Sequence, residues 1–158
     1  MPTATIEKQL LMTGIGFCLL SKAMLEQGTS IRFQALGRSM HPFIQSNDVI
    51  TLSPYGNNLP CMGDIVAYQN PCSDSLMVHR VVGMRADKYY IAGDNNHKSI
   101  DIVPLENIFG RVTQIARNKK AVKFGLGSER FLIAILTRKG LIARFLPFAS
   151  KIRRYLMT

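Results

Sequence analysis

Short runs of hydrophobic residues fill the middle of the chain, and several of them alternate with polar residues at every second position. Runs that are rich in Val, Ile and Tyr and bounded by turn-forming residues are typical of β-strands. Between residues 30 and 115 they read SIRFQAL, DVITL, DIVAY, LMVHRVV, KYYIA and IFGRVTQI. The clusters SPYGNNLP, QNPCSDS and GDNNHKS separate them as turns. This pattern predicts an antiparallel, partly barrel-like sheet.

The N-terminal residues follow a helical period instead. Over residues 4–27, positions on one helix face recur every three or four residues, at Ile6, Leu10, Thr13, Phe17, Leu20 and Met24. Gly28 is a suitable stop. The uncharged stretch LLMTGIGFCLL has 11 residues, whereas a helix that spans a bilayer needs about 20. We therefore expect an amphipathic helix packed on the domain and no transmembrane helix; a secretory signal ending at Ala23 is the alternative.

Positive charge is concentrated at the other end of the chain. The formal net charge is +10, and residues 117–158 carry eleven basic residues and one acidic residue, Glu129. Residues 1–116 carry nine of each sign and are neutral by the same count. We therefore expect an anionic partner for the C-terminal part.

Apolar patches lie between the basic residues of the segment 128–156, and Gly140 and Pro147 divide this segment into short helices. Such a segment is typical of an amphipathic helix lying on an anionic membrane surface. Alternatively, its apolar faces pack on the β domain and its cations are solvated. Because the cations alternate with aliphatic side chains more than with stacking aromatic ones, we expect no nucleic-acid partner.

These patterns predict a mainly β (α+β) chain with an N-terminal helix (1–28), a β domain (29–124) and a basic amphipathic helical tail (125–158). Its 158 residues, 47% hydrophobic and 19% charged, exclude a disordered protein and suffice for one domain with a core. The three cysteines, an odd number at loose spacing, argue against a disulfide framework.

A candidate nucleophile lies in the segment GRSMHP, where Ser39 leaves a strand and enters a turn that contains Pro42. Such a turn exposes a hydroxyl and leaves neighbouring backbone N–H groups free to form an oxyanion hole. The competing interpretation is a turn serine that caps the local backbone.

A serine hydroxyl needs a base, and His79 in LMVHRVV is the candidate. A histidine followed by Arg80 inside an apolar run needs a polar partner, so a structural histidine is the alternative. Either Asp94 or Asp101, in GDNNHKSID, could accept a hydrogen bond from the other ring nitrogen. Asp94 could instead stabilise its own turn.

Five segments occur in a recognisable order: SMHP, GDIVAY, MVHRVVG, YIAGDNN and IFGRV. Together, over about residues 35–113, they resemble the catalytic domain of the signal peptidase I superfamily. The histidine at position 79 resembles the endoplasmic-reticulum and archaeal-type branch, here as a short form without a transmembrane anchor. The resemblance implies a signal-peptidase-like β-barrel or sheet core and a serine endopeptidase without metal or other cofactor.

The same resemblance implies roles for individual residues. Ser39 would be the nucleophile, His79 the general base and Asp101 the third member, because the catalytic aspartate of that branch follows the GDNN turn. Four residues would support the site or its oxyanion hole: Gly37, Met40, Arg80 and Asp94.

The implied substrate is a leader or signal-like peptide, bound as an added strand along a sheet edge. We expect a protein that is cytoplasmic or peripheral to the inner membrane. The alternative function is a catalytically inactive peptide-binding or membrane-surface protein of the same fold.

Overall fold

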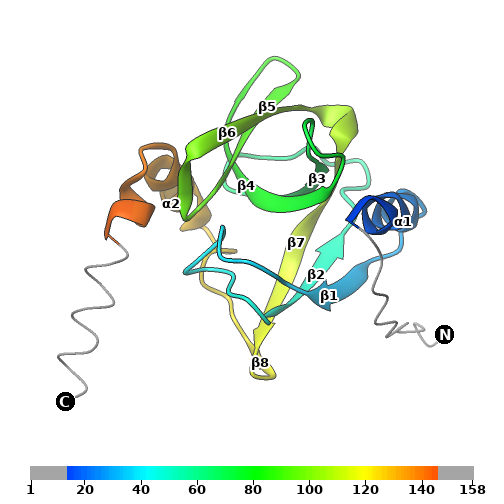
Figure 1. Cartoon of the computed structure of the whole chain (residues 1–158), viewed down its shortest axis with the longest axis horizontal. Coiled ribbons are helices and arrows are strands. Elements are labelled where there is room, and N and C mark those ends of the chain that lie inside the picture. Colours follow the sequence, from blue (N-terminus) through cyan, green and yellow to red (C-terminus); the bar gives the residue numbers. More distant parts are fainter. Residues whose placement is uncertain (1–13, 146–158) are drawn as a thin grey trace.

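The computed structural model describes residues 14–145 and is mainly β, with one antiparallel sheet and short helices beside it (Figure 1). The strand order is β1-β2-β7-β3-β4-β5-β6, and β8 pairs with β7. The elements are α1 (Gly14–Glu26), β1 (Ile31–Gln34), β2 (Val49–Ser53), β3 (Ile65–Gln69), β4 (Leu76–Arg85), β5 (Lys88–Gly93), β6 (Asn96–Pro104), η1 (Leu105–Asn107), β7 (Ile108–Arg117), β8 (Lys120–Ala121) and α2 (Arg130–Arg138).

The six predicted strand runs are confirmed as β1, β2, β3, β4, β5 and β7. The sequence pattern missed β8 and most of β6, which begins inside the cluster that we predicted as a turn. Gly93 pairs with Asn96, so the turn consists of Asp94 and Asn95 alone. Because β6 pairs only with β5, it lies at the edge of the sheet, where polar residues are tolerated and the apolar pattern weakens.

The central strand β3 separates two hydrophobic cores. Ile65 and Ala67 belong to a core shared with α1, β1, β2 and β7, whereas Val66 and Tyr68 belong to a core shared with β4, β5 and β6. Because both faces of β3 are buried, its sequence is an unbroken apolar run rather than an alternating one. The second core supports the site described below.

Helix α1 packs on the first core and ends as predicted. The N–H of Gly28 donates to Leu25 O and the N–H of Thr29 to Met24 O, which closes the helix. The predicted inward face is wrong at Leu20, which is 43% exposed; Cys18, Ser21 and Leu25 are the buried residues. The helix carries apolar side chains around most of its circumference, so the spacing of these residues does not predict which face is buried. The predicted helical residues 4–13 lie outside the described residues.

Helix α2 lies at the opposite side of the molecule from α1 (Figure 1) and buries Ile133, Ala134 and Thr137. Gly140, with a φ of 69°, follows α2, and residues 141–145 are helical again, as predicted for a segment divided at Gly140. Pro147 and the rest of the predicted tail lie outside the described residues. Within residues 14–145, no helix is both long and apolar enough to cross a bilayer.

Candidate active site

The structure brings Ser39 and His79 together, although they are 40 positions apart in the sequence. The Ser39 Oγ lies 3.0 Å from the His79 Nε2, within the range that proton transfer requires. The loop that carries Ser39 is closed at its base, where the Ala35 N–H donates to Asp48 O and the Asn47 N–H to Ala35 O. Ser39 therefore lies on a loop whose two ends are fixed.

The β5–β6 hairpin holds this loop against His79. The Asn95 N–H donates to Ser39 O over 2.7 Å, and the Asn95 side-chain amide donates to Arg38 O over 3.2 Å. A Cβ atom on Gly93 would lie 2.7 Å from Ser39 O and 3.3 Å from His79 Nε2. The two catalytic candidates can meet here because residue 93 has no side chain.

His79 is buried in β4, opposite Val66 of β3. Burial lowers the pKa of His79 below its ordinary value of 6.5, and the carboxylates of Asp101 and Asp94 oppose this effect. The imidazole is therefore neutral at neutral pH, which is the form that can accept a proton from a serine hydroxyl.

The other ring nitrogen of His79 does not contact a carboxylate directly. The His79 Nδ1 lies 3.1 Å from the Tyr68 hydroxyl, and this hydroxyl donates to the Asp101 Oδ2 over 2.5 Å. The Asn70 side-chain amide donates to the same Asp101 oxygen over 3.2 Å. The predicted third member is thus present, but Tyr68 stands between it and the histidine.

This arrangement determines where the hydrogens lie. Burial, together with Asp101, raises the pKa of Tyr68, so the hydroxyl stays protonated. Because its hydrogen points to Asp101, the Tyr68 oxygen accepts a hydrogen bond from His79 Nδ1–H. The Nε2 is then free to accept a hydrogen bond from Ser39, as a general base must.

The sequence alone places Tyr68 in the GDIVAY motif and does not indicate a role for it in the site. Two signals could have found it. A tyrosine at the end of a buried strand needs a partner for its hydroxyl. Tyr68 also lies two residues after Val66, on the same face of β3, and Val66 pairs with His79. The contact between Tyr68 and His79 depends on the register between β3 and β4, which the sequence does not reveal.

Asp94 does not contact His79, and the structure gives it a different environment. Both of its carboxylate oxygens lie 2.9 Å from the Arg80 guanidinium, and the Thr137 hydroxyl donates to it over 2.6 Å. Arg80 is fully buried and also donates to Gly63 O and Gly125 O. Asp94 and Arg80 therefore join the hairpin to α2 and the sheet.

The two remaining predicted residues shape the loop around Ser39. Gly37 has a φ of 90°, a conformation that favours glycine. Met40 buries its side chain in the first core, and its carbonyl accepts the N–H groups of Phe43 and Ile44. Among residues 14–145, none accepts a hydrogen bond from the Ser39 N–H. An N–H group without such an acceptor is a candidate donor to a bound oxyanion.

A cavity of about 210 Å³ lies elsewhere, between the start of β3, β7 and the start of α2. Its lining includes Arg111 and Arg130 and none of the residues that surround Ser39. The candidate active site is therefore a surface feature at the Ser39 loop, separate from this cavity.

No protein-family model matches the chain, and no curated protein matches its sequence. A neutral buried imidazole contacts a serine hydroxyl on one side and, through Tyr68, a carboxylate on the other. This arrangement is suited to nucleophilic acyl transfer by Ser39.

Proposed function

We propose that the protein is a serine endopeptidase of the signal peptidase I type, with Ser39 as nucleophile and His79 as general base. The observation that carries the proposal is the 3.0 Å contact between Ser39 Oγ and His79 Nε2. Support comes from the hydrogen-bonded chain behind the histidine, through Tyr68 to Asp101. Burial keeps the His79 imidazole neutral and the Tyr68 hydroxyl protonated, as the reaction needs.

In the proposed reaction, the Ser39 oxygen attacks the carbonyl carbon of the scissile peptide bond while its proton passes to His79 Nε2. The resulting imidazolium donates through Nδ1 to the Tyr68 oxygen, and the nearby Asp101 carboxylate stabilises its charge. The Ser39 N–H donates to the oxyanion. His79 then protonates the leaving amine, the C–N bond breaks, and an acyl-enzyme remains on Ser39.

Hydrolysis of the acyl-enzyme repeats these roles with water. His79 takes a proton from the water molecule as its oxygen attacks the ester carbonyl, and then returns a proton to the departing Ser39 oxygen. The peptide acid is released and the starting state is restored. No metal or other cofactor takes part in the proposed cycle.

A substrate strand has a place to bind. Among the described strands, β1 pairs only with β2, so its other side is a free edge, and the chain runs from it directly into the Ser39 loop. A leader or signal-like peptide added along this edge would bring its backbone to Ser39. We further propose that the sheet forms a signal-peptidase-like barrel core and that the protein is located in the cytoplasm or at the inner-membrane surface.

The proposal is tested by mass spectrometry of a peptide library incubated with the protein. The expected result is cleavage that Ser39→Ala abolishes and that Ser46→Ala, an exposed serine in the same loop, leaves unchanged. Circular dichroism checks that Ser39→Ala is folded. Cleavage that persists in folded Ser39→Ala would refute the proposal.

The alternative function, an inactive peptide-binding protein, makes the opposite prediction. Such a protein would bind library peptides without cutting them, and Ser39→Ala would bind as well as the wild type. The intact contact between Ser39 and His79 favours the enzyme.

A further inference from the structure

Helix α2 presents a second apolar face to solvent. Its buried side consists of Ile133, Ala134 and Thr137, yet Phe131, Leu132 and Ile135 on the outer side are 50%, 59% and 41% exposed. At 100° per residue these three side chains share the face opposite the core. Contiguous exposed apolar side chains on a small protein mark an interaction surface.

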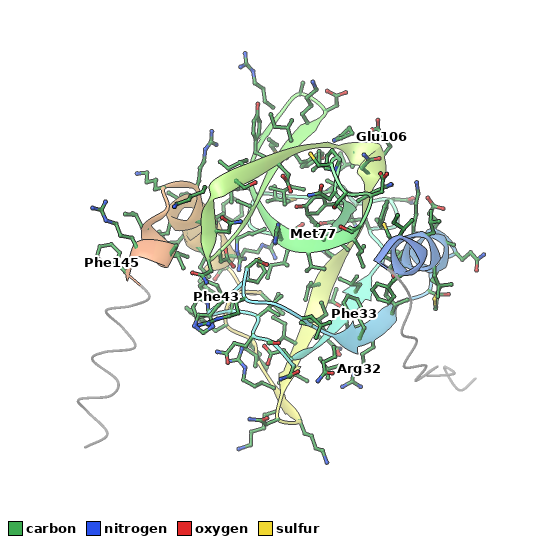
Figure 2. All side chains as sticks on the ribbon, viewed as in Figure 1. Arg32, Phe33, Phe43, Met77, Glu106 and Phe145 are labelled. Atoms are coloured by element: carbon green, nitrogen blue, oxygen red, sulfur yellow. The ribbon has the colours of Figure 1, made fainter. Side chains whose placement is uncertain are left out.

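Two exposed cations lie at the C-terminal end of this outer face. Lys139 is on the same side of the helix, and Arg144 is exposed one turn further along the chain. The Arg138 guanidinium instead turns back to the sheet, where it contacts Val82 O and the Tyr90 ring. Phe145 is 61% exposed and lies on the α2 side of the molecule (Figure 2). Apolar side chains bordered by cations are typical of helices that lie in the headgroup region of a bilayer.

Acidic side chains do not offset this charge. Residues 122–145 contain five basic residues and one acid, Glu129. The Glu129 carboxylate already accepts the N–H groups of Gly125 and Gly127, over 2.7 and 3.1 Å. The body of the protein, residues 1–116, has no net charge, so the α2 end forms a distinct positive region. The complementary partner is a surface that is both anionic and apolar underneath.

We propose that the outer face of α2 docks on an anionic lipid bilayer, with Phe131, Leu132 and Ile135 inserted among the lipids and Lys139 and Arg144 at the headgroups. The sequence left two interpretations of this segment, packing on the β domain or lying on a membrane. In this proposal both hold, because one side of α2 packs on the sheet and the other side binds lipid. The proposal does not depend on the chemistry of Ser39.

Sedimentation with vesicles tests this surface on the full chain. Binding to phosphatidylglycerol–phosphatidylcholine vesicles is expected, with little binding to pure phosphatidylcholine and weaker binding at high salt. Leu132→Gln should weaken binding about tenfold, because the variant loses the free energy gained when the leucine side chain moves from water into the lipid. Leu19→Gln is the matched control, since Leu19 is 60% exposed on α1 at the opposite side of the molecule.

The charge contribution is measured separately. Lys139→Gln and Arg144→Gln should each weaken binding to anionic vesicles about fivefold. Arg32→Gln, an exposed cation on the far side of the molecule (Figure 2), should leave binding unchanged. Equal losses for the α2 variants and their controls, or equal binding to neutral vesicles, would overturn the proposal.

A fluorescent reporter distinguishes lipid from other occupants of the face. The chain contains no tryptophan, so Phe131→Trp reports from this position alone. Its emission should shift to the blue only when anionic vesicles are added, and brominated lipids should quench it. A blue-shifted emission already present without vesicles would show that a second copy or the chain itself covers the face, and the proposal would fail.

Discussion

His79 can act as a base only when its Nε2 carries no hydrogen, and its neighbours meet this condition. The Tyr68 hydroxyl accepts the Nδ1 hydrogen because its own hydrogen is directed to Asp101. Burial keeps the ring neutral by lowering its pKa. In the proposed reaction, Tyr68 is therefore a positioning residue, which acts on Ser39 only through His79.

The pH dependence of the reaction follows from the state of His79. The rate should rise with pH as the imidazole loses its proton and reach a plateau by neutral pH, because burial places the pKa of His79 below 6.5. The measurement is the rate of Ser39 acylation between about pH 4 and pH 8. A rate that is still rising above neutral pH would contradict the assignment.

The lowered pKa of His79 also makes the free energy of unfolding depend on pH. Unfolded His79 binds a proton at its ordinary pKa, whereas the folded side chain resists it. The contribution of His79 to the free energy of unfolding is therefore full above pH 6.5 and declines as the pH falls below it. Denaturant titrations of wild type and His79→Gln should show a smaller pH dependence for the variant over this range. Identical pH dependences would indicate that the ring titrates equally in both states.

Removing the Tyr68 hydroxyl tests its place in the chain. Tyr68→Phe leaves the buried Nδ1–H unpaired, a loss worth about 1–3 kcal/mol, so acylation should slow about tenfold to a hundredfold. The apparent pKa in the pH–rate profile should also move, because the link to Asp101 is broken. Tyr89→Phe, a buried tyrosine of the same core, is the control. A Tyr68→Phe protein with an unchanged rate and profile would show that the tyrosine is only structural.

Among the structural elements, the β5–β6 hairpin does most to form the site. Its two turn residues point in different directions, since Asp94 binds the buried Arg80 and Asn95 binds the Ser39 loop. Gly93, directly before them, allows Ser39 and His79 to approach each other. The GDNN motif thus connects the sheet, α2 and the Ser39 loop.

A methyl group at position 93 should separate the catalytic pair. Gly93→Ala would place a Cβ 2.7 Å from Ser39 O, so the loop must shift and acylation should fall about a hundredfold or more, as for a displacement of about 1 Å. Gly14→Ala is the control, because its Cβ would lie at an ordinary 3.7 Å from its nearest neighbour. Full activity in Gly93→Ala would contradict the observed contact.

Asp94 and Asp101 should differ in what their removal affects. Asp94→Asn leaves the buried Arg80 without a carboxylate and should lower the free energy of unfolding by about 3–5 kcal/mol. Urea unfolding measures this, with the exposed Asp87→Asn within about 0.5 kcal/mol of wild type. Asp101→Asn should instead slow acylation with a smaller loss of stability. A large loss of stability in Asp101→Asn together with slow acylation but normal stability in Asp94→Asn would contradict these assignments.

At the scale of the whole molecule, the mainly β class and most strands could be predicted because buried strands such as β3 have strongly apolar sequences. Ser39, His79 and Asp101 could be proposed from their motifs. The role of Tyr68 could not, because it depends on the register between β3 and β4. The polar edge strand β6 was missed for a related reason, since its hydrogen bonds to β5 rather than its side chains determine its conformation.

The proposed reaction depends on activation of the Ser39 hydroxyl by His79. Reaction with a fluorophosphonate probe, followed by peptide mapping, tests it most directly, because such probes phosphonylate serines that a neighbouring base has activated and release fluoride. A single adduct on Ser39 is expected in the wild type and none in folded His79→Gln. Wild-type Ser39 that stays unmodified, or an adduct that forms equally well in His79→Gln, would contradict it.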